Sequence, residues 1–183
     1  MDFSLLKTSL DGVFQIQCKV ASDNRGRFIK NFRASHLKEL GLETQFVEEF
    51  VTTSHKNVVR GLHFQTPPQD HVKLVSCFGG EILDVVVDLR KGSPTYGKHE
   101  SFHLKEDLGR SIYIPKCFAH GFLALTDHAV VHYQVSTEHS PANDAGILWS
   151  SAEIKWPVES PIISERDSKF VALKDFQSPF ALS

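Results

Sequence analysis

The sequence predicts a mainly β protein, an antiparallel sandwich or barrel with a few short helices. Valine, isoleucine and phenylalanine recur in short runs separated by turn residues, as in "RSIYIP", "GFLALT" and "AVVHYQVS". Helix signals are sparse. With 183 residues, 41% of them hydrophobic, the chain is long enough to bury one core. We therefore expect a single domain over residues 1–183, without a linker, an internal repeat or a low-complexity segment.

Two glycines mark a turn that we expect between neighbouring strands. In "KLVSCFGGEILDVVVDLR", the pair Gly79-Gly80 supplies the positive φ that a tight β-hairpin needs. The stretch from Val58 to Val75, "VVRGLHFQTPPQDHVKLV", also has the pattern of a hairpin of buried strands, yet it carries an arginine, a histidine and a lysine. Such groups are costly in buried strands unless they are paired, so a functional reason for them is worth seeking.

Helices are expected at only two places. Ser35 is a candidate cap for a short surface helix over "HLKELGL", which would end near Gly41. In the last part of the chain, Pro157 and Pro161 interrupt regular structure. We expect this tail to wrap the sheet before a short final helix.

Alternation along two strands predicts which side chains share a face. In "AVVHYQV", Val131, Tyr133 and Val135 point to one side, so Tyr133 enters the interior with the valines. In "VVRGLHFQ", the set that alternation puts on one face is Val59, Gly61, His63 and Gln65. Because Gly61 has no side chain, we expect a cavity beside His63.

Composition excludes several classes of partner. The formal net charge is −2 with both signs interspersed, which leaves no basic stripe for nucleic acid or an anionic membrane surface. Cys18, Cys77 and Cys117 are an odd number without CxxC spacing, which argues against a disulfide framework or a zinc ribbon. The start "MDFSLLKTSLDGV" lacks the features of a signal peptide, and no apolar run approaches ~18 residues. We expect a cytoplasmic protein with no membrane partner.

The candidate chemical groups are His63, Lys73, His120 in "IPKCFAHGF", Tyr133 and an acidic residue of the tail. Each has a structural explanation when it is taken alone. A histidine can be bonded to a backbone carbonyl in the core, a tyrosine can be an ordinary core residue, and a lysine can be solvated at a sheet edge. Only as a set do they indicate a reaction site.

Seven segments in order make the chain similar to the dTDP-4-dehydrorhamnose 3,5-epimerase family, from about Asp23 to Asp167. They are "NRGRF", "KNVVRGLHFQ", "KLV", "GEILDVVVDLRKGSPTYG", "IPKCFAHGF", "GILW" and "WP". The resemblance implies an antiparallel cupin-like (jelly-roll) β-barrel and a homodimer that pairs through its N-terminal strands. It also implies an isomerase that needs no metal or other cofactor. The substrate implied is a nucleotide-diphospho-4-keto-6-deoxyhexose, inverted at carbon 3, carbon 5 or both.

The same resemblance implies a role for individual residues. His63 would be the catalytic base, Asp167 in "SERD" its partner, and Tyr133 the acid on the opposite face of the sugar, while Lys73 would stand beside the substrate ketone. The positions implied to bind substrate are Arg25, Lys30, Glu48, Phe50, Arg60, His120, His139, Asp144 and Arg166.

These residue types suit the chemistry. A ketone at sugar carbon 4 acidifies the protons on carbons 3 and 5, so one base can remove either and leave an enolate. Histidine suits the base because its ordinary pKa lies near neutrality. A carboxylate beside it fixes its tautomer, a lysine stabilises the enolate oxygen, and arginines bind diphosphate through paired hydrogen bonds.

The nucleobase positions depart from the family pattern. Lys30 replaces a glutamate, Glu48 and Phe50 replace glutamine and asparagine, and His139 replaces the tyrosine that stacks on thymine. Asp144 and Arg166 are milder exchanges for glutamate and lysine. The catalytic set is unchanged, so these exchanges question thymine as the base more than they question epimerisation. We hypothesise a base with an amino group, cytosine before guanine. The alternative is that these positions have drifted and that the substrate is still dTDP-linked, held mainly by the arginines on its diphosphate.

Three other readings remain open. A metal site in a cupin needs about three protein ligands, two of which often come from an HxH pair. In this sequence the corresponding segment is His63-Phe64-Gln65, so the second histidine is missing, and His71 or Glu81 would have to replace it as a ligand. A sugar-nucleotide sensor without catalysis would not need a base, its partner and an acid together. A 3,4-ketoisomerase uses similar proton transfers, and only the family segments favour the epimerase over it.

Overall fold

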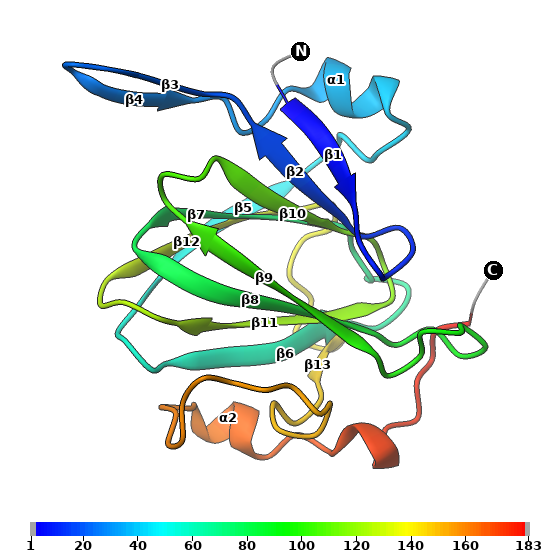
Figure 1. Ribbon diagram of the computed structural model, residues 1–183. Helices are drawn as coiled ribbons and strands as arrows, with labels where there is room; N and C mark the ends of the chain where they lie inside the picture. Colours follow the sequence, from blue (N-terminus) through cyan, green and yellow to red (C-terminus); the bar gives the residue numbers. More distant parts are fainter. Residues whose placement is uncertain (1–2, 182–183) are drawn as a thin grey trace.

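Two antiparallel sheets facing each other form the body of the molecule (Figure 1). The computed structural model describes residues 3–181. The six-stranded sheet has the order β1 (Phe3–Lys7), β2 (Phe14–Cys18), β10 (Arg110–Ile114), β7 (Lys73–Gly79), β12 (Ala129–Val135), β5 (Glu48–Ser54). The five-stranded sheet has the order β13 (Asp144–Gly146), β6 (Val59–Gln65), β11 (Phe118–Ala124), β8 (Glu81–Asp88), β9 (His99–Lys105).

The remaining elements lie outside this sandwich. A separate hairpin, β3 (Val20–Asp23) and β4 (Gly26–Ile29), projects from one end of the molecule, at the upper left of Figure 1. Helix α1 (Ala34–Glu39) follows the hairpin, while α2 (Glu165–Ser168) and the short 3-10 helix η1 (Leu173–Asp175) belong to the tail. The tail runs below β6 and β13 in Figure 1.

The predicted mainly β, antiparallel cupin-like fold with few short helices is confirmed. One detail differs, because the strands pair into two separate sheets and do not close into a barrel. The core between the sheets is made by residues that alternate inward along their strands, for example Val75, Val86, Phe122 and Val131. Because the two inner faces supply the same layer, any polar side chain at an inward position lies between the sheets.

Both predicted hairpins are wrong. β6 and β7 belong to different sheets, and so do β7 and β8. The chain crosses from one sheet to the other at Gly79-Gly80, where only Gly80 has a positive φ, of 68°. A Cβ on Gly80 would lie 2.3 Å from Thr126 Oγ1, so the crossing is also too crowded for a side chain. The polar stretch from Val58 to Val75 therefore spans the two walls of the sandwich.

A cavity does lie beside His63, as expected, but Gly61 does not open it. A Cβ on Gly61 would lie 2.6 Å from the Cα of Gly121 in β11, so the backbone of the neighbouring strand fills the space. The register also shifts at this point, because His120 pairs with His63 but Phe122 pairs with Arg60. Directly opposite residues share a face, and the shift therefore turns Arg60 inward. Val59, which pairs with Leu123, lies on the outer face and not with His63.

The other local predictions have mixed outcomes. β12 alternates as expected, with Val131, Tyr133 and Val135 buried. The first helix forms, but Ser35 is not its cap: the N-cap is Arg33, without a side-chain capping bond. The side chain of Ser35 instead accepts a hydrogen bond from Arg33 Nε at 3.1 Å.

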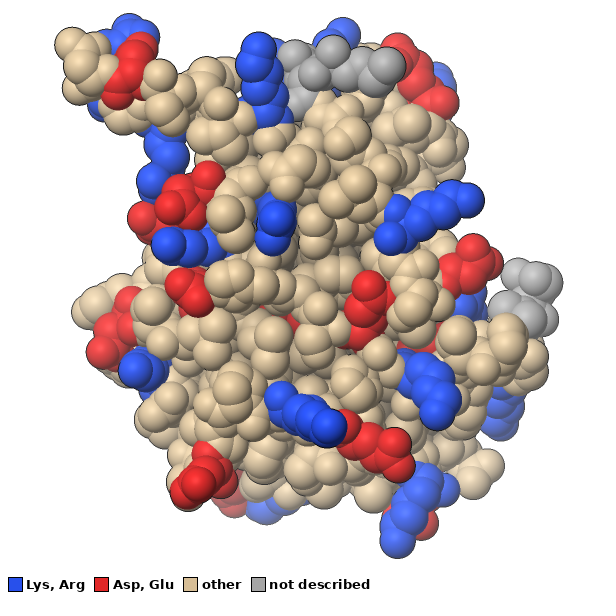
Figure 2. Space-filling model, viewed as in Figure 1, with Lys and Arg blue, Asp and Glu red and all other residues tan. Residues whose placement is uncertain are grey.

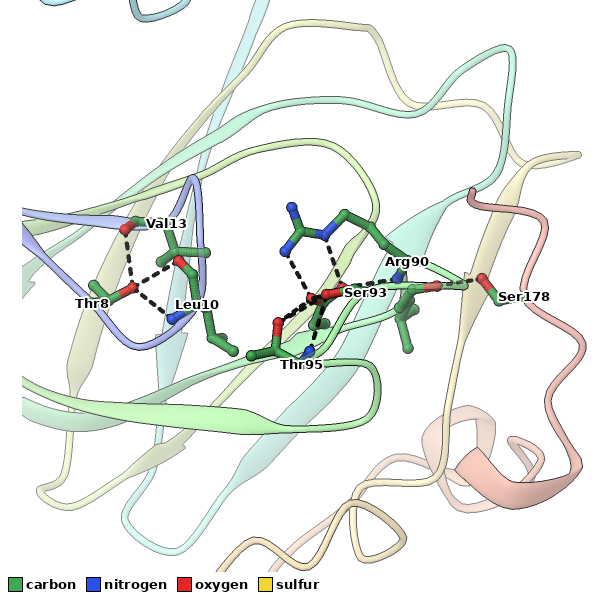
Figure 3. Close-up of polar contacts among 9 residues, drawn as sticks. Thr8, Leu10, Val13, Arg90, Ser93, Thr95 and Ser178 are labelled. Atoms are coloured by element: carbon green, nitrogen blue, oxygen red, sulfur yellow. Dashed lines mark hydrogen bonds and ion pairs between the residues drawn. The ribbon is translucent and has the colours of Figure 1, made fainter. Parts of the chain in front are cut away.

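A buried carboxylate organises the loop after β8. Asp88 accepts hydrogen bonds from the backbone and guanidinium of Arg90 and from the hydroxyls of Ser93 and Thr95, at 2.6 to 3.0 Å. Figure 3 shows Arg90, Ser93 and Thr95 converging on one point, while Ser178 bonds the backbone nearby. Burial acts to raise the pKa of Asp88, but the hydrogen bonds from Arg90, Thr95 and Ser93 outweigh it and lower the pKa. The neighbouring bond from Ser178 to the backbone oxygen of Leu89 joins this loop to the C-terminal tail.

The face of the molecule seen in Figure 2 is not strongly charged. On the side seen in Figure 2, positive and negative side chains are interspersed. Within residues 3–181, the longest helix is far too short to cross a membrane.

Candidate active site

A cavity of about 350 Å³ lies between the two sheets. The five-stranded sheet contributes His63 and His120, and the six-stranded sheet contributes Lys73 and Tyr133. The other lining residues are Glu48, Phe50, Thr52, Arg60, Phe64, Gln65, His71, Gly121, Val135, His139, Asp144 and Arg166. The polar stretch that is unusual in the sequence therefore lines an internal, partly polar space.

His63 is paired with Asp167. Its Nε2 lies 2.9 Å from Asp167 Oδ1, and Asp167 Oδ2 accepts the backbone N–H of Gly61 at 3.1 Å. Ser164 caps α2 by accepting the N–H of Asp167, so the short helix holds this carboxylate against β6. Burial acts to raise the pKa of Asp167, but the bond to His63, the charge of His63 and the bond from Gly61 together lower it. The carboxylate therefore stays ionised beside the imidazole.

Lys73 is almost completely buried at the start of β7. Its Nζ donates to the backbone oxygen of His63 at 3.1 Å, across the gap between the sheets. Burial lowers the pKa of Lys73 to about 8, against the opposing attraction of Asp144 and Asp84. The ammonium is thus held beside the base and within the cavity.

Asp84 is a site residue that the sequence reasoning missed. His120 Nε2 lies 2.7 Å from Asp84 Oδ2, and both side chains are buried. The other carboxylate oxygen, Oδ1, has no hydrogen-bond partner within residues 3–181. Burial lowers the pKa of His120, although Asp84 acts in the opposite direction. A signal was present in "EILDVVVD", where alternation puts Asp84 inward between Ile82 and Val86.

Tyr133 stands on the opposite wall, in β12. Its ring meets His120 edge to face, with centroids 5.8 Å apart, and stacks on Phe50 with centroids 4.6 Å apart. Burial raises the pKa of Tyr133 well above its ordinary value, and the negative charge of Asp84 adds to the effect. The phenol therefore keeps its proton throughout the physiological range.

Two arginines lie at the open side of the cavity. Arg166 forms an ion pair with Asp144 at 2.8 Å, and its guanidinium lies 5.3 Å from the centre of the Phe170 ring. Arg60 donates to Ser54 Oγ at 3.0 Å. Both cations are exposed, so they can meet an anion that arrives from solvent.

Glu48 and His139 form a second contact at this side. Glu48 Oε2 accepts the backbone N–H of His139 at 2.7 Å, which joins β5 to the loop after β12. The ring of His139 is exposed. Among residues 3–181, no hydrogen bond is found to the other carboxylate oxygen, Oε1, of Glu48.

Arg25 and Lys30 are not brought to this cavity. Both belong to the projecting β3–β4 hairpin or its end, and Arg25 pairs there with Asp23. The sequence reasoning also gave no substrate-binding role to His71 and Gln65. Gln65 Nε2 lies 3.2 Å from His71 Nδ1, and burial lowers the pKa of His71 to about 3, with the charge of Lys73 as the next cause. Both line the cavity as neutral groups.

The residues that the structure describes contain no group of three His, Cys, Asp or Glu side chains placed to hold a metal ion. Of the alternative ligands considered from the sequence, His71 lines the same cavity as His63, and Glu81 does not. His71 bonds Gln65, and Glu81 bonds His103 on the outer strand pair β8 and β9.

Comparison with known proteins agrees with this geometry. Residues 7–175 match the family model of dTDP-4-dehydrorhamnose 3,5-epimerase. A dTDP-4-dehydrorhamnose 3,5-epimerase of Methanothermobacter thermautotrophicus is 43% identical over 95% of this chain and 96% of its own. A second, from Shigella flexneri, is 40% identical over 92% of this chain and 96% of its own.

A solved structure gives the same result in three dimensions. The dTDP-6-deoxy-D-glucose-3,5-epimerase of Legionella pneumophila, in complex with dTDP-4-keto-L-rhamnose, is 33% identical, covers 99% of this chain and 100% of its own, and superposes with a TM-score of 0.93. The fold and the comparisons together define an isomerase with a cupin-like fold. The chain belongs to the dTDP-4-dehydrorhamnose 3,5-epimerase family, and it is an epimerase.

Proposed function

We propose that this epimerase inverts carbon 3, carbon 5 or both in a nucleotide-diphospho-4-keto-6-deoxyhexose, by proton transfer through an enolate and without a metal. The observation that carries the proposal is the placement of His63 and Tyr133 on opposite walls of one cavity. Inversion requires a proton to leave one face of the sugar and another to arrive at the opposite face. A base and an acid on facing sheets meet that requirement.

His63 is the base in this proposal. Asp167 holds Nε2, which leaves Nδ1 to take the proton next to the ketone, and the ionised carboxylate stabilises the imidazolium that forms. General base catalysis of this kind contributes about 10²–10⁴ in rate. Without Asp167, the ring would lose both its fixed tautomer and the compensating charge.

Lys73 stabilises the enolate oxygen. Its ammonium is buried, and a fixed charge in a site with little water contributes most where negative charge develops. The buried pair of His120 and Asp84 provides a second polar group beside it, since His120 is opposite His63 in the β6–β11 register. Tyr133, which stays protonated, returns the proton to the other face.

The nucleotide end of the substrate lies at the open side of the cavity. Arg60 and Arg166 are exposed there and suit a diphosphate, which guanidinium groups bind through two parallel hydrogen bonds. Glu48 has a free carboxylate oxygen, which suits an exocyclic amino group such as that of cytosine. His139, whose side chain is exposed at this side, stacks on the base in this proposal. We infer a base with an amino group, cytosine before guanine, in preference to thymine.

We also propose that the protein is a homodimer that pairs through its N-terminal strands. The β3–β4 hairpin projects from the body and exposes 65% of Phe28 beside charged side chains. Arg25 and Lys30 are too far along this hairpin to line the cavity of their own chain. In a dimer, the hairpin brings them to the cavity of the partner subunit.

Isotope exchange tests the reaction. The protein is incubated with dTDP-, CDP- and GDP-4-keto-6-deoxyhexoses in heavy water, and deuterium is located by NMR. We expect deuterium at carbon 3, carbon 5 or both, in products of inverted configuration, with the same rate in the presence of a chelator. A product with its carbonyl at carbon 3 would identify a ketoisomerase, and the absence of exchange with all three nucleotides would refute the proposal.

A further inference from the structure

We propose that Phe50 is a positioning residue for Tyr133: its ring covers one face of the phenol, keeps water from it, and so directs the returning proton to the inverted face. The inference rests on the proposed function, because it takes Tyr133 as the acid. It gives Phe50 a task that differs from contact with the nucleobase.

The strand register places the two rings together. Phe50 in β5 and Tyr133 in β12 are directly opposite each other in an antiparallel pair. Their centroids are 4.6 Å apart and their planes differ by 14°. Side chains opposite each other in such a pair are close enough to pack, and stacked aromatic pairs contribute about 0.5–1.5 kcal/mol beyond the area that they bury. The stack therefore restricts the orientation of the phenol.

Exposure shows which ring is the outer one. Phe50 is 42% exposed, whereas Tyr133 is only 7% exposed, although both line the cavity. β12 lies between β7 and β5, and β5 is the edge strand of the sheet. The ring of Phe50 is thus the outer neighbour of the phenol and lies between it and solvent, while the buried ring of His120 also contacts Tyr133, at a steep angle.

This arrangement matters for the outcome of each turnover. An enolate can be protonated from the inverted face by Tyr133, or it can regain a proton on the original face. If the phenol is held in place and water is excluded from it, protonation of the inverted face by Tyr133 is favoured. If the phenol is mobile and hydrated, a larger share of the enolate regains its proton on the original face, and protons are exchanged without inversion.

A chemical probe tests the cover without any substrate. The chain has three tyrosines, and Tyr96, at 36% exposed, serves as an internal reference for nitration by tetranitromethane. Mapping by mass spectrometry should show nitration at Tyr96 but little at Tyr133 in the unmodified sequence. Phe50→Ala should raise nitration of Tyr133 several-fold relative to Tyr96. Phe50→Tyr should leave nitration of Tyr133 low; the tyrosine introduced at position 50 is excluded from this comparison.

Phe78→Ala is the matched control. Phe78 stacks on His132 with centroids 4.9 Å apart and planes differing by 14°, but on the outer face of the same sheet. It is 49% exposed, so the substitution removes a ring of similar exposure without opening the cavity. Tyr133 should stay protected in this variant. If Tyr133 is equally unreactive in Phe50→Ala, or equally reactive in Phe78→Ala, the inference is wrong.

Turnover provides the second measurement. With whichever of the dTDP-, CDP- and GDP-4-keto-6-deoxyhexoses the unmodified protein turns over fastest, in heavy water, Phe50→Ala should increase the ratio of deuterium in unreacted substrate to deuterium in inverted product several-fold. Phe50→Tyr should keep the ratio low. In a Tyr133→Phe background, Phe50→Ala should not change the ratio further, because Phe50 acts on the ratio only through the phenol of Tyr133. A variant that raises only KM and leaves the ratio unchanged would make Phe50 a wall of the binding site and overturn the inference.

The two measurements separate this inference from the proposed function. If the unmodified protein exchanges no sugar proton, the proposed reaction fails, and nitration still reports whether Phe50 covers Tyr133. If the reaction proceeds and Phe50→Ala leaves the exchange ratio unchanged, only the inference fails. Should Phe50→Ala prove unstable by thermal unfolding, Phe50→Leu, which keeps apolar volume but removes the stack, takes its place in both measurements.

Discussion

His63 and Tyr133 reach the same cavity from sheets that share no hydrogen-bonded strand pair, the first from β6 and the second from β12. The two side chains therefore belong to opposite walls, and no single turn or strand sets their separation. It is set by the packing of the core between the sheets. The roles proposed for them differ accordingly, and variants should separate proton removal from proton return.

Loss of the base should abolish both steps. His63→Ala or Asp167→Ala should reduce deuterium exchange at the sugar carbons by about 10²–10⁴, the usual contribution of general base catalysis. Tyr133→Phe should keep exchange but reduce inversion, because an enolate still forms and is reprotonated from solvent or from its original face. NMR of the sugar protons in heavy water measures both. Unchanged turnover in His63→Ala would contradict the assignment.

Activity should fall on the alkaline side because of Lys73. Burial lowers its pKa to about 8, so the ammonium loses its proton as the pH rises through that value. Since the positive charge is what stabilises the enolate, kcat should decline above pH ~8 in the unmodified protein. Lys73→Arg keeps its charge at all accessible pH values, because the pKa of arginine is above about 12. Above pH ~8, the kcat of Lys73→Arg should stay constant, although its maximum should be lower than that of the unmodified protein. An identical decline of kcat in Lys73→Arg and in the unmodified protein would exclude Lys73 as the cause.

The Asp88 network should stabilise the fold in a pH-dependent way. Its carboxylate has a lowered pKa in the folded state, so its contribution is complete above the unfolded pKa of about 3.9 and is lost as the pH falls through the folded value. Asp88→Asn should cost about 3 kcal/mol at pH 7, or about 6–12 °C in Tm, because the partly buried Arg90 loses its counter-charge. Glu165→Gln removes an exposed ion pair with Lys169 and should change Tm little. Equal Tm values for the two variants would contradict the network's role.

Nucleotide affinity decides the base. Calorimetric titration with CDP, GDP and dTDP should give the tightest binding for CDP, since the free oxygen of Glu48 can accept an amino hydrogen. Glu48→Gln should reduce the preference. If dTDP binds at least ten times tighter than the others, about 1.4 kcal/mol, the exchanged positions carry no meaning for specificity.

Mixed subunits test the dimer. Light scattering should give twice the mass of one chain at micromolar concentration. If Arg25 acts in the cavity of its partner, then mixing Arg25→Ala subunits with His63→Ala subunits should restore activity to about a quarter of normal, because half of the dimers are mixed and one of their two sites is complete. Mixing inactive variants would restore nothing if both residues serve the same chain.

The fold class followed from the sequence because alternation and turn residues are local signals. The partner of each strand did not, since β6, β7 and β8 are consecutive and yet alternate between sheets. The glycines were interpreted locally as a turn and a gap, while their actual constraint is the approach of a distant strand, as at Gly61 and Gly121.

The same limit applies to the site. One cavity brings together four of the predicted residues, His63, Lys73, His120 and Tyr133. Asp84 was not predicted, because in the sequence it is a single acidic residue among valines. Its importance depends on His120, which is 36 residues away and meets it only when β8 and β11 pair. Arg25 and Lys30, assigned by resemblance, lie on a projecting hairpin whose contacts one chain does not determine.

The bond between His63 and Asp167 joins residues 104 positions apart, and Asp167 comes from the tail that is packed under β6. Long loops must close before such a contact forms, and proteins rich in distant pairings fold slowly. We therefore expect enzymatic activity to appear late in the folding of each newly made chain. A chain whose sheets have formed but whose tail has not docked has Lys73, Tyr133 and Arg60 but lacks Asp167 and Arg166, so we expect it to bind sugar nucleotides weakly without turning them over. During refolding, ligand binding should therefore return earlier than enzymatic activity.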